Sequence, residues 1–347
     1  MRTKTFLAKT FLAKTVLGCL LAACLGTGAA LADDQAPIII KFSHVVAADT
    51  PKGKGAEMFK KLAEERTHGR VKVEVYPNSQ LYKDKEEIEA LQLGAVQMLA
   101  PSLAKFGPLG VREFEVFDLP YIFPNTQVLR AVTDGPIGAS LLKKLESKGI
   151  LGLAYWDNGF KIMSANRPLI KPEDLHGLKM RIQSSKVLDA EMRQLGALPQ
   201  VMAFSEVYQG LQTGVVDGTE NPPSNMYTQR MHEVQKYATL TNHGYLGYAV
   251  IVNKQFWDGL PADIRAELES AMKDATVYTN QIAQKENDDA LAAMKASGKT
   301  QFHQPTPAEM EAWRQAMLPV HKQMENRVGK DLIQSIYKVA EKYGFKY

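Results

Sequence analysis

Short apolar strands alternate with helical segments between residues 38 and 100, and this order limits the fold more than any other feature of the chain. The segments with strand composition are Ile38–Ser43, Val71–Tyr76 and Val96–Ala100, and those with helical periodicity are Pro51–Thr67 and Lys83–Leu93. Because β-α-β crossovers have one hand, this order predicts a largely parallel sheet. Ligands of such sheets bind beside the carboxyl ends of the strands, where His44 and the loop Pro101–Lys105 lie.

The same alternation continues beyond residue 120 and indicates a change of lobe. We expect a helical segment at Thr126–Lys148 and strands at Leu151–Trp156, Phe160–Ala165, Leu178–Ile182, Tyr237–Asn242 and Tyr248–Val252. Asp157-Asn158-Gly159 is expected to break the first of these strands and to mark a crossing into a second lobe. Gly244 and Gly247 mark the expected return, and Gly218 an expected turn.

A long helical pattern follows, from Leu260 to about Ala296. At 1.5 Å per residue it would be ~50 Å long, which is longer than one lobe. The sequence therefore predicts an α/β fold with two lobes in a clamshell, joined by more than one crossing and by a helix that spans both. The expected lobes are residues 33–158 plus 247–286, and residues 159–246 plus 287–347.

The first 32 residues have the layout of a secretory signal peptide. A basic start without acids precedes the apolar run Val16–Leu25, and a small-residue stretch ends at Ala30-Leu31-Ala32. We therefore expect export and cleavage after Ala32. Two alternatives stay open: a membrane anchor, for which the run is shorter than the ~20 residues that a spanning helix needs, and lipidation at Cys24.

Removal of this segment changes the charge and the thiol content of the chain. The 42 basic and 38 acidic residues become 38 of each, because four basic residues lie in the signal. No block of lysine or arginine remains to suggest nucleic acid or a membrane surface as a partner. Cys19 and Cys24 also lie in the signal, which excludes cysteine catalysis, disulfides and cysteine-ligated zinc in the mature chain.

Arg181 is the strongest candidate for a binding residue. It lies between Met180 and Ile182 in a short apolar strand, where a permanent charge is costly unless an anion meets it. The guanidinium fork suits a carboxylate held by two parallel hydrogen bonds. That carboxylate belongs either to a ligand or to an internal acid such as Asp217 or Glu220, and composition does not decide between them.

Other candidates lie near Arg181 in the sequence. Lys161 could supply a second cation, Asn221 could donate an amide hydrogen bond, and Phe204 could form an apolar wall. Each of these residues also has an ordinary structural explanation. His44 and His243 lack metal-ligand spacing, and the chain has none of the nucleophile, phosphate-loop or dinucleotide motifs of enzymes. We therefore expect neither a metal nor a cofactor.

Taken together, these residues resemble the solute-binding subunit of tripartite ATP-independent periplasmic (TRAP) transporters. The most similar stretches are Asn158–Lys161, Asp174–Arg181, Met202–Tyr208 and Val216–Pro222. The stretches that look most like the DctP branch, which takes up four-carbon dicarboxylates, are Phe42–Val46, Tyr155–Ala165 and Arg181–Ser185. The resemblance implies a periplasmic binding protein that is a monomer, is not an enzyme, and delivers its ligand to the TRAP membrane permease.

The resemblance also implies roles for individual residues. Arg181 matches the arginine that clamps the ligand carboxylate, Asn221 the asparagine that assists it, and Phe204 the aromatic ring that packs on the ligand. Lys161 stands where other branches have a second arginine, and Ser184 at a further contact position. The looser matches in cleft-lining loops are His44, Ser102, Lys105 and His243. The implied second carboxylate would be reached by Lys161, Lys105 or His44.

Three alternatives remain beside this interpretation. The same binding module could take a monocarboxylate, a keto acid or a sugar acid, in which case a second cation is not needed. An exported lyase with His44 or His243 as base would need a motif that the chain lacks. A sensory component that presents the dicarboxylate to a membrane kinase is compatible with the same residues.

Overall fold

The computed structural model describes residues 36–347. The expected signal peptide, its cleavage site and both cysteines lie outside the described residues. Residues Pro37–Tyr347 form one compact unit with two β-sheets. Among the helices of this unit, none combines the length and the apolar character needed to cross a membrane.

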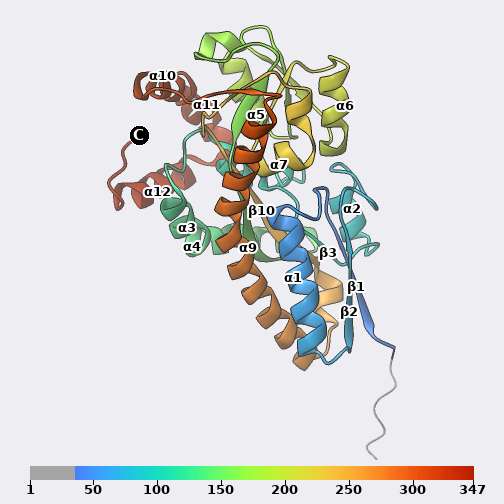
Figure 1. Ribbon diagram of the computed structural model, residues 1–347. Helices are drawn as coiled ribbons and strands as arrows, with labels where there is room; N and C mark the ends of the chain where they lie inside the picture. Colours follow the sequence, from blue (N-terminus) through green and yellow to red (C-terminus); the bar gives the residue numbers. More distant parts are fainter. Residues whose placement is uncertain (1–35) are drawn as a thin grey trace, which may run out of the picture. The chain divides into compact units, whose positions relative to one another are not determined.

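The first sheet has five strands in the order β2-β1-β3-β10-β4 (Figure 1). Their bounds are β1 Ile38–Ser43, β2 Val71–Tyr76, β3 Met98–Leu99, β4 Ile150–Phe160 and β10 Tyr245–Asn253. Strands β2, β1 and β3 are parallel, as the alternation predicted, whereas β10 runs antiparallel to both β3 and β4. The carboxyl ends of β1 and β3 therefore lie at one edge of the sheet.

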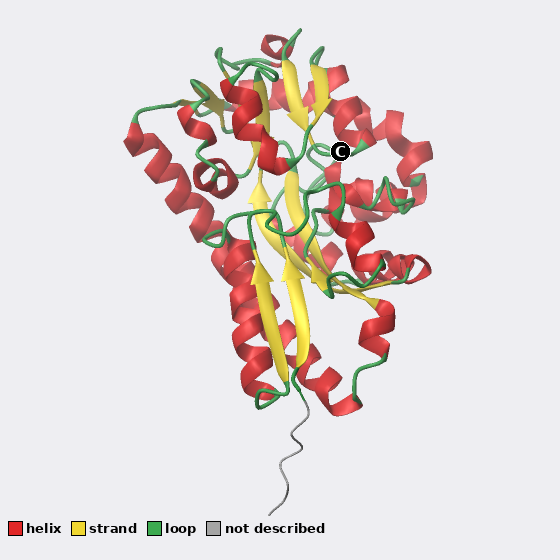
Figure 2. Cartoon of the chain, turned by 90° about the vertical axis from the view of Figure 1, so that its right-hand side faces the viewer, coloured by secondary structure: helices red, strands yellow, loops and turns green. Residues whose placement is uncertain are grey.

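The second sheet has six strands in the order β11-β9-β5-β8-β6-β7. Their bounds are β5 Ile162–Ala165, β6 Lys179–Ile182, β7 Leu198–Val201, β8 Gly218–Asn221, β9 Tyr237–Thr239 and β11 Gln301–His303. The two sheets are joined where β4 continues into β5 and where β9 leads into β10, as Figure 2 shows for the long central strands. Only Lys161 separates β4 from β5.

Twelve α-helices cover these sheets in the described part of the chain. They are α1 Pro51–Arg66, α2 Glu87–Gln92, α3 Thr126–Thr133, α4 Pro136–Lys144, α5 Lys186–Gln194, α6 Val207–Gln212, α7 Pro223–Thr228, α8 Lys254–Asp258, α9 Ala262–Ser297, α10 Pro307–Met317, α11 Pro319–Val328 and α12 Lys330–Glu341. Helix α9 has 36 residues and packs along both α1 and α7, so the expected helix that reaches both sheets is confirmed (Figure 1).

The core is divided between the faces of the two sheets. One cluster lies between the first sheet and helices α1 and α9 and contains Phe42, Phe59 and Trp156. A second covers the other face of that sheet and contains Phe114 and Phe117. Two further clusters pack on the second sheet. Each fully buried large side chain contributes about 1.5–3 kcal/mol, so both sheets are rigid platforms for the residues at their edges.

The start of α1 has a well-defined cap. The Thr50 hydroxyl accepts a hydrogen bond from the backbone N–H of Gly53 at 3.1 Å, and Pro51 occupies the first helical position, where its missing N–H costs nothing. The cap holds Lys52 at the carboxyl ends of β1 and β3, with its side chain in the core.

Three local expectations are wrong. Strand β4 does not end at Asp157 but continues to Phe160, because helix α9 satisfies its backbone where the pairing with β10 shifts register. The N–H of Asp157 donates to Asn280 Oδ1 at 2.8 Å, and Asn287 Nδ2 donates to the carbonyl of Asn158 at 2.7 Å. Side chains distant in sequence thus replace strand neighbours, which the local motif could not indicate.

The other two wrong expectations concern the segments around Pro136 and Gly218. The expected helix Thr126–Lys148 is divided into α3, α4 and a short 3₁₀ turn, because Pro136 starts a new helix and Gly135 before it is extended. Gly218 begins strand β8 rather than forming a turn. A Cβ there would lie 2.3 Å from the carbonyl oxygen of Ser164, so glycine allows the close approach of β5.

The lobe boundaries expected from the sequence stay a prediction. They depend most on helices α11 and α12, which fall in the part assigned to the second lobe. The buried residues of these helices, Val320, Ile333 and Ile336, belong to the same apolar cluster as Phe114 of the first lobe.

Candidate functional site

Arg181 projects from β6 and is 3% exposed. Its Nε donates to the carbonyl of Met202 at 3.0 Å. Asp217 and Glu220, the two acids considered as internal partners, bind other groups: Asp217 accepts from the N–H of Lys179, and Glu220 contacts Lys161 and His243. Within residues 36–347, Arg181 forms no ion pair with any carboxylate, so its outer nitrogens are free for a ligand.

Two predicted neighbours complete the wall around Arg181. The guanidinium carbon lies 5.9 Å from the centre of the Phe204 ring, within the range of a cation–π contact. Asn221, at the end of β8, accepts a hydrogen bond from Asn225 Nδ2 at 3.3 Å, which fixes the orientation of its amide. Burial lowers the pKa of Arg181, and the charges of Asp84 and Glu220 oppose that shift.

A small cavity of about 20 Å³ separates this wall from the edge of the first sheet. Its polar lining consists of Lys52, Asp84, Ser102, Lys105, Arg181, Gln183, Asn221, Asn225 and Tyr248, and its apolar lining of Val45, Val46, Phe204 and Leu246. The cavity thus brings together five of the nine predicted site residues: Arg181, Phe204 and Asn221 on one wall, and Ser102 and Lys105 on the other.

The facing wall carries two buried lysines with different surroundings. Lys105 contacts both Asp84 and Glu87, with Nζ at 2.5 Å from Glu87 Oε1. Burial disfavours the charged form of Lys105, but these two carboxylates outweigh it and raise its pKa. Lys52 instead donates to the carbonyl of Ala100 at 2.9 Å and lies 3.8 Å from the centre of the Tyr248 ring.

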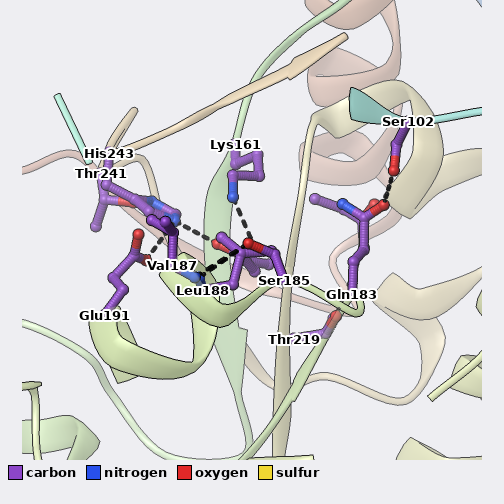
Figure 3. A network of polar contacts seen from close by, with 12 residues as sticks. Ser102, Lys161, Gln183, Ser185, Val187, Leu188, Glu191, Thr219, Thr241 and His243 are labelled. Atoms are coloured by element: carbon purple, nitrogen blue, oxygen red, sulfur yellow. Dashed lines mark hydrogen bonds and ion pairs between the residues drawn. The ribbon is translucent and has the colours of Figure 1, made fainter. Parts of the chain in front are cut away.

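Direct hydrogen bonds link the two walls. Ser102 Oγ donates to Gln183 Oε1, as Figure 3 shows, and the N–H of Phe204 donates to Asp84 Oδ2. Burial favours the neutral form of Asp84, but the charges of Lys105 and Arg181 outweigh it and lower its pKa to about 2. An ionised Asp84 is therefore a firm acceptor between the walls. A cavity of this volume holds about one water molecule, so a larger solute does not fit while the walls are this close.

Lys161 does not reach this cavity. It is 1% exposed, and its Nζ lies 2.8 Å from Glu220 Oε1. Gly244 makes room for it, since a Cβ there would lie 2.6 Å from Lys161 Cε. The reason for the pairing is the antiparallel register of β5 and β8, which sets Met163 opposite Glu220 and brings Glu220 beside the residue before β5.

His243 belongs to the same cluster as Lys161 rather than to the cavity. Its Nε2 lies 2.7 Å from Glu220 Oε2, and its Nδ1 lies 2.7 Å from the hydroxyl of Thr241. Burial raises the pKa of Glu220 in principle, but Lys161 and His243 outweigh it and lower that pKa to about 2. The cluster is therefore an internally neutralised unit at the point where β4 passes into β5.

Glu191 on α5 lies beside this unit and is the one acid of the group without a hydrogen bond to any described residue. Burial, and then the charge of Glu220, raises its pKa well above the usual value. Ligand atoms of Glu191, Glu220 and His243 lie within 4.8 Å of one another, which is the spacing of a metal site. Lys161 already supplies a positive charge to Glu220.

His44 and Ser184 take separate positions. Both ring nitrogens of His44 lack a hydrogen-bond partner among the described residues, and burial, followed by the charge of Lys52, lowers its pKa to about 3. The ring is therefore neutral and lies behind the cavity wall. Ser184 lines a smaller adjoining hollow with Arg181 and Gln183.

Comparison with known proteins agrees with this architecture. The sequence model of the DctP family, described as "Bacterial extracellular solute-binding protein, family 7", matches residues 42–327. The chain belongs to this family. The resemblance that its motifs carry is therefore confirmed at the level of the family.

Several family 7 relatives are close. The chain is 71% identical, over 86% of its length and 90% of the relative, to the C4-dicarboxylate-binding periplasmic protein DctP of Rhodobacter capsulatus. A TRAP periplasmic solute-binding protein of Sulfurospirillum deleyianum with bound succinate matches with a TM-score of 0.85 and 47% identity, over 88% of this chain and all of that one. A counterpart from Pseudomonas aeruginosa with bound L-malate gives 0.81 and 47%, over 83% and 100%. The expected two-lobed fold is confirmed by these family 7 structures.

Five polar cavity residues of this family 7 chain were not among the predicted ones: Lys52, Asp84, Gln183, Asn225 and Tyr248. Lys52 had a detectable signal, since the helix after β1 begins at the carboxyl ends of the strands. Asn225 follows Asn221 by four residues on the next helix, and Gln183 is two residues beyond Arg181. Tyr248 comes from β10, whose place between β3 and β4 is not readable from the sequence.

Proposed function

We propose that this chain captures a four-carbon dicarboxylate, such as succinate, malate or fumarate, in the cavity between its two lobes and delivers it to a TRAP membrane permease. The observation that carries the proposal is the environment of Arg181. Its guanidinium is buried and forms no ion pair with a carboxylate of residues 36–347, and two buried lysines, Lys52 and Lys105, face it across the cavity. Cations on both walls suit a ligand with a carboxylate at each end.

The first carboxylate is assigned to Arg181. Two parallel N–H···O bonds from the guanidinium would hold it, with the Asn221 amide as a further donor. The ring of Phe204 closes the apolar side of the site and contacts the guanidinium. Charge-assisted hydrogen bonds contribute about 1.5–3 kcal/mol each, which is enough for micromolar affinity when both ends of the ligand are held.

The second carboxylate is assigned to the wall of Lys52, Lys105 and Ser102. In this assignment the second carboxylate does not contact Lys161, His44 or His243. Lys161 and His243 are bound to Glu220 outside the lining of the cavity, whereas Lys105 lines the cavity although it also contacts Asp84 and Glu87. His44 is held neutral by burial. Tyr248 orients the site, because its hydroxyl accepts from Asn158 Nδ2 at 2.8 Å while its ring face contacts Lys52.

Entry requires the two walls to separate. The links to be broken are Ser102–Gln183 and Asp84–Phe204, whereas the strands that join the sheets, β4 to β5 and β9 to β10, stay connected. These connections make a hinge, and rebinding of the same two links would complete closure over the ligand. The closed form would be the one that docks on the permease.

The remaining expectations belong to the same proposal. The segment before the described residues would direct the chain to the periplasm and be cleaved after Ala32. The mature protein would act as a monomer, without cofactor, and would release its ligand unchanged rather than convert it. Nothing in the cavity pairs two titratable groups as acid and base, since Asp84 is bound to Lys105.

Isothermal titration calorimetry of the purified mature chain tests the proposal. Succinate, malate and fumarate should bind with dissociation constants in the micromolar range or below, and butyrate at least 100-fold more weakly, because it leaves one wall unpaired. Arg181→Lys should weaken succinate at least tenfold, since the fork is lost. Stronger binding of butyrate or of a sugar acid than of all three dicarboxylates would overturn the assignment of the ligand.

A further inference from the structure

Lys52 forms no ion pair with an acid of the described residues. It is 1% exposed, in the first turn of α1, and its Nζ contacts one carbonyl oxygen, that of Ala100, and the face of the Tyr248 ring. An ammonium group offers three donors. In the described part of the chain only one of them meets an acceptor, and the ring face provides the rest of the contact.

The charged and titratable groups that face Lys52 come from all the elements around it: His44, Asp84, Glu87, Lys105, Arg181 and Tyr248. The two acids are both occupied by Lys105, which they contact directly. Helix α9, which packs along α1, presents Thr279 to Gly55 and pairs its Glu286 with the half-buried Lys54. Two of these groups are cations, Lys105 and Arg181, and both acids are in direct contact with Lys105 rather than with Lys52.

Burial, and after it the charge of Lys105, lowers the pKa of Lys52 to about 7, against the smaller opposing effects of Glu87 and Asp84. The two lysines of this wall thus differ in kind. Lys105 is a permanent cation within an ion-pair group, while Lys52 exchanges a proton near neutral pH. A carboxylate placed in the cavity beside Lys52 would favour its charged form.

We propose that Lys52 recognises the second carboxylate of the ligand by taking up a proton, so that a dicarboxylate dianion binds together with one proton from solution. The amine becomes an ammonium group as the carboxylate arrives, and the proton stays on Nζ. This inference rests on the proposed function, because it needs a ligand with a second carboxylate. It gives the site a means of selection, since a monocarboxylate would leave Lys52 uncharged.

The direction of the pH dependence follows from linkage. A group that gains a proton on binding makes the association constant fall as pH rises, by up to tenfold per pH unit for one proton. At pH 8 a lysine with a pKa near 7 is mostly neutral, so binding should take up most of one proton per ligand. Below pH 6 Lys52 is already charged, and uptake by this group falls to about zero.

Calorimetry of succinate binding at pH 8 in several buffers measures this number directly. The observed enthalpy is plotted against the ionisation enthalpy of the buffer, and the slope is the number of protons taken up. We expect a slope approaching one for the unchanged protein at pH 8 and a much smaller slope at pH 6. Binding with a slope near zero at pH 8 would overturn this inference alone, whereas absence of binding by any four-carbon dicarboxylate would overturn the proposed function.

Variants identify the group that takes up the proton. Lys52→Arg keeps a permanent charge, so its slope should fall to about zero and its affinity should lose the pH dependence between 6 and 8. The matched control is Lys54→Arg, two residues further along α1, half-buried and paired with Glu286, which should keep the full slope. If Lys52→Arg keeps the full slope, a group other than Lys52 takes up the proton and the inference is wrong. If this variant does not fold, ¹⁵N spectra of lysine side chains in the unchanged protein, titrated with and without succinate, decide whether the Nζ of Lys52 changes charge.

Discussion

Arg181 and Lys161 are both buried cations beside β8, yet of the two only Lys161 has a carboxylate partner among the described residues. Lys161 lies 2.8 Å from Glu220, and the same carboxylate binds His243. Arg181 has a carbonyl, an aromatic ring and a cavity around it, but no carboxylate partner within residues 36–347. The charge of Lys161 is compensated inside the protein, away from the cavity, and supports the fold, whereas the charge of Arg181 is available to a ligand.

The difference also separates stability from binding. Breaking a buried ion pair leaves an uncompensated charge and is strongly destabilising. Removing a buried cation that has no protein acid removes a desolvated charge and should cost the fold little. The two positions can therefore be distinguished by measuring unfolding and ligand affinity on the same variants.

The largest expected effect is that of Arg181→Met on affinity. Succinate binding should weaken by about 100-fold or more, because truncating one partner of a buried charge pair costs about 2–5 kcal/mol. The melting temperature of the ligand-free protein should fall little or rise. Calorimetry and thermal unfolding measure the two quantities. Arg193→Met, an exposed arginine on α5 that pairs with Asp189, is the control and should leave affinity unchanged.

The opposite pattern is expected for Lys161→Met. The free energy of unfolding should fall by about 3–5 kcal/mol, because Glu220 keeps a buried charge with only His243 beside it. Protein that is folded should bind succinate within about threefold of the unchanged chain. Adding Glu220→Gln should restore part of the stability, as chemical denaturation would show. If the free energy of binding falls by more than the free energy of unfolding, Lys161 contacts the ligand.

A smaller effect, with a defined pH dependence, is expected for Glu191→Gln. The raised pKa of Glu191 means that the folded protein keeps a proton that the unfolded chain releases above about pH 4.3. Glu191 therefore lowers stability as pH rises through that range toward its folded pKa. The variant should gain about 1 kcal/mol at pH 8 and less at pH 5. Denaturation curves at both pH values check this, and an equal change at both would contradict it.

The smallest effect is expected at the exposed rim of the cavity. Lys83 and Glu206 form an ion pair at 3.0 Å that joins the two walls, and each side chain is about half exposed. Such pairs are worth about 0–1 kcal/mol and are screened by salt. Lys83→Ala should change succinate affinity less than about threefold, and the difference should vanish in high salt. A tenfold loss would show that the rim contributes to closure.

The chain order and the helix that reaches both sheets were readable from periodicity, because strand and helix repeats are local. The register of β5 and β8, which sends Lys161 to Glu220, was not. The same limit explains the error at Asp157, whose backbone is satisfied by Asn280 of α9, 123 residues away in sequence. Contacts between elements decide these points, and a single sequence does not specify them.

The cavity residues divide in the same way, into those that lie in local sequence motifs and those that only the folded chain brings together. The motifs that carry Arg181, Phe204 and Asn221 lie within about forty residues, and the structure brings all three to one wall. The facing wall is assembled from the first turn of α1, the loop after β3 and the middle of β10, which meet only in the folded sheet. Lys52 and Tyr248 were missed because neither lies in a motif with a recognisable spacing.

A crystal structure with succinate bound is the most direct test of the central claim, that Arg181 is left without an internal acid in order to hold a ligand carboxylate. We predict two parallel hydrogen bonds of about 2.7–2.9 Å from the guanidinium to one carboxylate. Lys161 should remain on Glu220, and Lys52 and Lys105 should face the other carboxylate. Succinate held by Lys161, with Arg181 turned onto Asp84 or Glu220, would contradict the account.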